Sequence, residues 1–245
     1  MAKEGPEGAP AAKPEQAPAS TSARAEIDAF LAEARALQPS TEAGQRGRLI
    51  FALDATMSRQ PTWDRACILQ ADMFREAASI GGLEVQLVYY RGHSECATSR
   101  WVADPSRLAG LMEKIDCRGG NTQIRRVLTH ARAETQRAKV QAVVFVGDAM
   151  EESADALSVT AGELGLLGTR VFMFQEGDDP SVERTFREVA RLSRGAYCRF
   201  SAGAAHELGE LLRAAAAYAA GGLKALNDLS KQRHAGAVRL LAQLR

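Results

Sequence analysis

The chain has 245 residues, of which 46% are hydrophobic and 25% are charged, and its formal net charge is +1. This length suits one globular domain with extensions, because single domains often reach about 250 residues. The nearly balanced charge gives no reason to expect nucleic acid or an anionic membrane as the main partner.

Cysteine spacing and hydropathy bear on the compartment. The four cysteines show no CxxC pair or metal-ligand spacing, which favours reduced thiols over disulfides or a zinc site. No apolar run approaches the roughly 18 residues that a membrane span needs. The N-terminus lacks the apolar segment of a signal peptide. We therefore expect a cytoplasmic protein.

The N-terminal part divides into two segments. Residues 1–23 are rich in Ala, Pro, Glu, Ser and Gly, a composition that predicts a disordered tail because it cannot bury enough apolar surface. Residues 24–46 are expected to hold a short amphipathic helix and a linker. The apolar residues at helical spacing are Ile27, Phe30, Leu31 and Leu37.

From residue 47 onward, apolar runs alternate with segments of helical periodicity. The predicted strands cover residues 47–54, 83–90, 94–102, 142–148, 169–174 and 197–200. The predicted helices cover 61–80, 105–115, a segment starting at 124, 154–167, 182–192 and a last helix through 220. This alternation predicts an α/β fold, a doubly wound and mostly parallel central sheet with helices on both faces.

Two boundaries complete the expected organisation. A tight turn at 91–93 predicts that the strand over 94–102 pairs antiparallel at the edge of the sheet. Gly221 and Gly222 end the predicted domain, which spans 47–220. The remaining stretch, 221–245, has leucines spaced for one amphipathic helix.

Carboxylates and hydroxyls gather at the predicted strand ends. Asp54 and Asp148 each end an apolar strand, and carboxyl ends of parallel strands are where ligands bind. Thr56 and Ser58 alternate with Asp54, so the three side chains can converge on one point. Thr122 follows a glycine-rich loop and can approach from a third direction. Such oxygen donors suit Mg²⁺, with Mn²⁺ or Ca²⁺ as possible substitutes.

These five residues resemble the metal-ion-dependent adhesion site (MIDAS) of the von Willebrand factor A (VWA) family. The family pattern is D-x-S-x-S, then a loop Thr, then an Asp after a central strand. Here Thr56 replaces the commoner Ser and keeps the hydroxyl, so an intact site is expected. The resemblance spans about residues 47–215. It implies a Rossmann-like VWA fold, hydroxyls that bind the metal directly, and at least one Asp that acts through water.

The resemblance also implies a function. A metal with neutral hydroxyl ligands attracts a Glu or Asp carboxylate of a partner protein, so we expect a bacterial, cytoplasmic adaptor for protein–protein interaction and not an enzyme. Family members of this kind often work beside ATPases or stress-response assemblies. Two alternatives stay open. One is a Mg²⁺-dependent phosphoryl or phosphate-ester hydrolase with Asp54 as nucleophile. The other is a scaffold with a vestigial metal site.

Other conspicuous residues have simpler interpretations. Glu151 and Glu152 are expected to be solvated charges or first-turn acids of the following helix. Trp63 either lines the binding face or anchors the helix that starts at Pro61. One stripe of arginines is expected to be a solvated face, and its members are Arg184, Arg187, Arg191 and Arg194.

Overall fold

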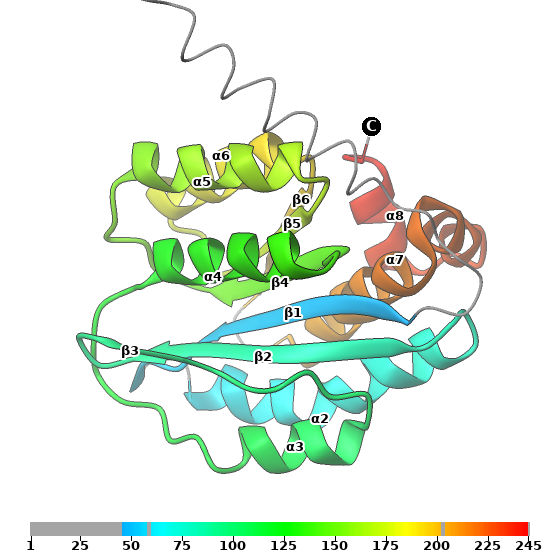
Figure 1. Ribbon diagram of the computed structural model, residues 1–245, viewed down its shortest axis with the longest axis horizontal. Coiled ribbons are helices and arrows are strands. Elements are labelled where there is room, and N and C mark those ends of the chain that lie inside the picture. Colours follow the sequence, from blue (N-terminus) through cyan, green and yellow to red (C-terminus); the bar gives the residue numbers. More distant parts are fainter. Residues whose placement is uncertain (1–45, 58–59, 202–203, 245) are drawn as a thin grey trace, which may run out of the picture.

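The computed structural model describes residues 46–57, 60–201 and 204–244 (Figure 1). The predicted tail over 1–23 and nearly all of the segment over 24–46 lie outside these residues. Within the part of the chain that is described, no helix is both long enough and apolar enough to cross a membrane.

A six-stranded sheet forms the centre of the domain. Its strands are β1 (Gly47–Asp54), β2 (Leu83–Arg91), β3 (Glu95–Thr98), β4 (Ala142–Gly147), β5 (Arg170–Glu176) and β6 (Ala196–Phe200). Their order in the sheet is β3-β2-β1-β4-β5-β6. All neighbouring strands are parallel except β2 and β3, so the predicted mostly parallel sheet with one antiparallel edge strand is confirmed. The edge strand is shorter than predicted, and a separate bridge joins Val102 to Val85.

Helices cover both faces of this sheet (Figure 1). They are α2 (Gln60–Ala78), α3 (Pro105–Met112), α4 (Ile124–Arg137), α5 (Ala154–Leu166), α6 (Pro180–Leu192), α7 (Ala205–Lys231) and α8 (Ala235–Leu241). One hydrophobic core joins the sheet to α2, α3, α7 and α8, and the other joins it to α4, α5 and α6. The doubly wound architecture is confirmed.

Strand β1 shows why the pattern reads as a buried central strand. Leu49, Phe51 and Leu53 pack into the first core, while Ile50 and Ala52 pack into the second. A strand that is buried on both faces has no polar alternation, which is the apolar run seen in the sequence. The polar residue that ends this run, Asp54, therefore marks the edge of the sheet.

Helix α7 lies directly against the start of β1. A Cβ atom on Gly47 would lie 2.0 Å from the carbonyl oxygen of Ala219, so the close approach of the two backbones requires glycine here. The alanines of α7 between 214 and 217 are fully buried, as expected for a helix seated this tightly.

The C-terminal stretch differs from the single helix that its leucines predict. Gly222 has φ 65° and interrupts α7, and a second break precedes α8. Helix α8 belongs to the folded domain, since Leu240 is fully buried. The side chain of Gln243 also covers the open edge of β6. Its Oε1 accepts the Tyr197 N–H at 3.0 Å, and its Nε2 donates to the Tyr197 carbonyl at 2.9 Å.

Candidate metal centre

Two aspartates lie at the carboxyl ends of neighbouring parallel strands. Asp54 is the last residue of β1, and Asp148 directly follows β4, whose Val146 pairs with Leu53 of β1. Asp54 is only 2% exposed, and Asp148 is half-buried. The register places both acids at the same end of the sheet, and the charge of Asp148 raises the pKa of Asp54. Two acids in a largely buried position form a centre of negative charge.

The two oxygens of the Asp54 carboxylate differ in their hydrogen bonds. Its Oδ1 accepts the Thr56 backbone N–H at 2.7 Å. Its Oδ2 is buried and has no hydrogen-bond partner among the described residues. Burial raises the pKa of Asp54, and the nearby charge of Asp148 raises it further, against opposing contacts with Thr56 and Tyr90. The ionised form is thus costly unless a cation or water reaches Oδ2.

Tyr90 is a member of this centre that the sequence did not reveal. It pairs with Asp54 in the register of β1 and β2, and its side chain is fully buried with its ring stacked on Phe145. Burial, together with the charges of Asp54, Glu152 and Asp148, raises the pKa of the Tyr90 hydroxyl well above its usual range. The hydroxyl acts on the Asp54 carboxylate but forms no hydrogen bond of ordinary geometry with a described residue.

The glycine-rich loop is pressed against two neighbouring loops. A Cβ atom on Gly120 would lie 2.1 Å from the Gly92 carbonyl oxygen, so only glycine permits this approach. The Asn121 N–H donates to the same oxygen at 3.2 Å, and the Arg118 N–H donates to the Ala55 carbonyl at 2.9 Å. These contacts bring Thr122, which is 7% exposed, to the edge of the sheet where Asp54 lies.

Glu151 and Glu152 do more than the solvated or first-turn role that their positions predict. The carboxylate of Glu151 accepts the Thr122 N–H at 3.0 Å, and the Glu151 N–H donates to the Thr122 hydroxyl oxygen at 3.1 Å. The carboxylate of Glu152 accepts the backbone N–H groups of Ile124 and Arg125. Both acids therefore hold the loop and helix that carry Thr122.

Glu152 supplies the N-terminal cap that α4 lacks in its own sequence. Gln123 stands at the N-cap position and makes no side-chain hydrogen bond to the helix. A carboxylate at this end also interacts favourably with the helix dipole. The cap comes from a residue 28 positions along the chain, so the helix start is fixed by a tertiary contact.

Replacing Glu152 by Ala is expected to lower the free energy of unfolding by about 1–2 kcal/mol, because two N–H groups of α4 lose their acceptor. Chemical denaturation measures the change. Glu188→Ala is the matched control, since its carboxylate pairs with Arg191 on the exposed surface of α6 and such surface pairs contribute little to stability. Equal stability of the two variants would show that the cap contributes little.

Of the five predicted ligands, the structure describes four. Asp54, Thr56 and Asp148 lie together. Thr122 is hydrogen-bonded to Glu151, and Glu151 is three residues after Asp148 in the chain. Ser58 lies outside the described residues. Among the described residues, no group of three or more His, Cys, Asp or Glu side chains is arranged to hold a metal. The predicted site would not form such a group, because it has only two carboxylates and its other donors are hydroxyls.

The donor set fits a hard cation. Carboxylate and hydroxyl oxygens are the ligands that Mg²⁺ prefers, and it commonly retains some water. The buried Oδ2 of Asp54 has no hydrogen-bond partner among the described residues, so it can accept such an ion or its water. The assignment of the five residues as ligands stays a prediction.

Trp63 and the arginine stripe have the simpler roles. Trp63 is 2% exposed, and its indole N–H donates to the Met112 carbonyl at 3.2 Å, so it anchors α2 to α3 and does not line an open face. On α6, Arg187 and Arg191 pair with Glu183 and Glu188 of the same helix on the surface.

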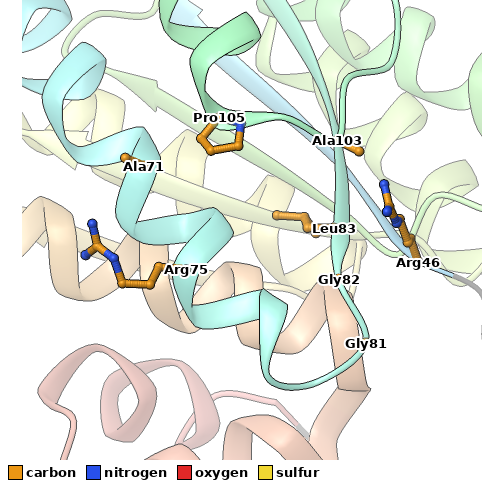
Figure 2. A pocket seen from close by; sticks show the side chains of 8 residues that line it. All are labelled: Arg46, Ala71, Arg75, Gly81, Gly82, Leu83, Ala103 and Pro105. Carbon is orange, nitrogen blue, oxygen red and sulfur yellow. The ribbon is translucent and has the colours of Figure 1, made fainter.

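A large cavity of about 660 Å³ lies away from this centre, at the start of β2 (Figure 2). Arg46 and Arg75 stand on opposite sides of it, so their guanidinium groups do not converge on one anion. Arg75 also pairs with Asp72. We therefore do not assign the cavity as a site for a charged ligand.

Neither a protein-family model nor a curated protein matches the sequence. Solved structures do. An aerotolerance-related membrane protein from Bacteroides fragilis superposes with a TM-score of 0.51 and 17% identity, over 69% of this chain and 98% of that one. The SpRpn10 VWA domain superposes with a TM-score of 0.53 and 10% identity, over 73% of this chain and 98% of that one. The chain has the von Willebrand factor A fold.

A third structure with this fold carries a metal. Proximal thread matrix protein 1 from the mussel byssus, with a zinc-occupied MIDAS motif, has a TM-score of 0.54 and 15% identity. The match covers 71% of this chain and 46% of that protein. VWA domains can thus bind a metal at the MIDAS. At this level of identity the likeness establishes the fold of the present chain and not its ligands.

Proposed function

We propose that the chain is an interaction module that binds a Glu or Asp carboxylate of a partner protein through Mg²⁺. The ion would be held by Asp54, Thr56, Ser58, Thr122 and Asp148. The observation that carries this proposal is the buried Asp54 carboxylate, whose Oδ2 has no hydrogen-bond partner among the described residues and which lies beside Asp148. A buried charge of this kind is costly unless it is paired.

The protein prepares the donors before any ion binds. The Thr56 N–H fixes Asp54 through Oδ1 and leaves Oδ2 for the ion or its water. The Glu151 N–H and carboxylate fix Thr122 at both its hydroxyl and its own N–H. Bound Mg²⁺ would supply positive charge and an open position for an oxygen ligand. Because three of the five proposed donors are neutral hydroxyls, that position favours an anion.

The surroundings of the centre can contact a partner. Met57, within the predicted metal loop, is 63% exposed and so is accessible to a partner. Arg118 is exposed, and its backbone is bonded to the Asp54 loop. A partner that places its carboxylate on the metal would therefore meet an apolar and a cationic side chain beside it.

Binding is favoured over hydrolysis by the state of Asp54. A nucleophilic carboxylate must reach the reacting phosphorus, whereas Asp54 is 2% exposed and one of its oxygens already accepts a hydrogen bond. We therefore expect no phosphatase activity with Mg²⁺. A cytoplasmic partner, such as an ATPase or a stress-response assembly, would fit the proposal.

A capture experiment tests this function. The full chain, immobilised as bait, is expected to retain a partner from its native cytoplasm in Mg²⁺ and to release it in EDTA. The Asp54→Asn bait is expected to lose that partner, while the exposed-surface control Asp228→Asn keeps it. A partner retained equally in EDTA, or by Asp54→Asn, would contradict the role of the metal.

A further inference from the structure

A groove lies between α3 and the residues that follow β3. Its volume is about 560 Å³, within the range of about 300–1,000 Å³ that is typical of small-ligand sites. Trp101, Val102 and Leu111 give it largely apolar walls, and Gly110 of α3 opens into it. A groove of this character can bury the apolar part of a ligand.

The groove is remote from the candidate metal centre. Val102 pairs with Val85, near the start of β2, whereas Asp54 pairs with Tyr90, near its end. The two sites therefore lie toward opposite ends of β2. A ligand of the groove would therefore not contact the metal.

The walls of the groove are fixed in place. The Trp101 indole N–H donates to Glu134 Oε2 at 2.9 Å, and the Arg48 guanidinium stacks on the indole ring at 3.8 Å. The Val102 N–H and carbonyl are both bonded to Val85, at 2.9 and 2.7 Å. Because these side chains and backbone groups are already ordered, a ligand would pay little entropy to order them.

The rim of the groove is positively charged. Arg100, Arg107 and Lys114 line it and are exposed, and none of the three forms an ion pair with another residue in the described part of the chain. Glu113 contributes the acidic group on the same rim. Unpaired cations around an apolar surface favour a ligand that combines an anionic group with an apolar body.

We propose that this groove binds an organic acid with an apolar body. The apolar part would lie against Val102 and Leu111, and the carboxylate or other acidic group would lie toward Arg107 and Lys114. The proposal does not depend on the function of the metal centre, and we expect the same binding in Mg²⁺ and in EDTA.

Two fluorescent probes that share their aromatic rings test the proposal on the full chain. Anilinonaphthalene sulfonate carries an anionic group, and phenylnaphthylamine lacks it. The anionic probe is expected to bind at least about fivefold more tightly than the neutral one, because only it can pair with the rim. Equal affinity of the two probes would overturn the assignment of an acid.

Substitution at Gly110 locates the binding. A Cβ atom there would meet nothing within 4 Å, so the side chain of Gly110→Leu can start into the groove, and the variant also replaces a helical glycine by a better helix former. We expect at least about tenfold weaker binding of the anionic probe. Gly162→Leu on α5 is the matched control, since a Cβ atom there also meets nothing within 4 Å, and its binding should equal that of the wild type.

The rim is tested by the double variant Arg107→Ala/Lys114→Ala. It is expected to bind the anionic probe about fivefold more weakly and the neutral probe unchanged. Thermal unfolding of each variant checks that it folds. If Gly110→Leu binds the anionic probe as well as Gly162→Leu does, the groove is not the binding site and the proposal is wrong.

Discussion

Gly120→Ala is expected to lower the free energy of unfolding by about 3 kcal/mol, because the added methyl group cannot fit. It would lie 2.1 Å from the Gly92 carbonyl oxygen, so one of the two backbones must move. Since Thr122 follows two residues later, the movement is also expected to weaken Mg²⁺ binding by at least about tenfold. Chemical denaturation and metal titration of the full chain measure the two effects.

Gly119→Ala is the matched control for that prediction. A Cβ atom on Gly119 would meet nothing within 4 Å, and its backbone does not have a positive φ. Its stability should therefore stay within about 0.5 kcal/mol of the wild type. If both alanine variants are equally stable and bind Mg²⁺ equally, the close approach of the glycine-rich loop to Gly92 does not position Thr122.

Asp54→Asn is expected to have opposite effects in the absence and in the presence of metal. Without metal, it should stabilise the domain by about 1–2 kcal/mol, because it removes a buried charge and its repulsion with Asp148. The amide oxygen can still accept the Thr56 N–H. With Mg²⁺ at a hundred times its dissociation constant, the wild type should gain about 2.7 kcal/mol, and the variant should gain nothing.

Thermal unfolding of both proteins in EDTA and in Mg²⁺ measures these changes. The expected order of stability therefore reverses when metal is added. A variant that is less stable than the wild type in EDTA would show that the Asp54 carboxylate is already satisfied without a cation, against what its Oδ2 indicates.

The sheet was predictable because its central strands are buried on both faces. The segment over 47–54 was predicted with the bounds that β1 has, since its apolar run ends where the chain leaves the core at Asp54. The carboxyl ends of parallel strands share one edge, so Asp54 and Asp148 could be placed together from sequence alone. The pair Gly221 and Gly222 also predicted a break in the chain, and α7 is interrupted at Gly222.

The features that escaped prediction depend on contacts between distant residues. Glu151 and Glu152 cap the loop and helix that carry Thr122 and Ile124, and no local pattern signals a cap from so far along the chain. In the sequence, nothing distinguishes Tyr90 from the apolar residues of its strand. Only the strand register, which pairs it with Asp54, shows that it belongs to the centre. The break before α8 places Arg233 at φ 65°, a conformation that the sequence would signal only with glycine or asparagine.

The central claim is that Asp54 belongs to a Mg²⁺ site, and isothermal titration of Mg²⁺ into the full chain tests it most directly. We expect the wild type and the surface control Asp228→Asn to bind one ion per chain, and Asp54→Asn to bind none. Mn²⁺ should behave in the same way. Absence of binding to the wild type, or unchanged binding to Asp54→Asn, would contradict the claim.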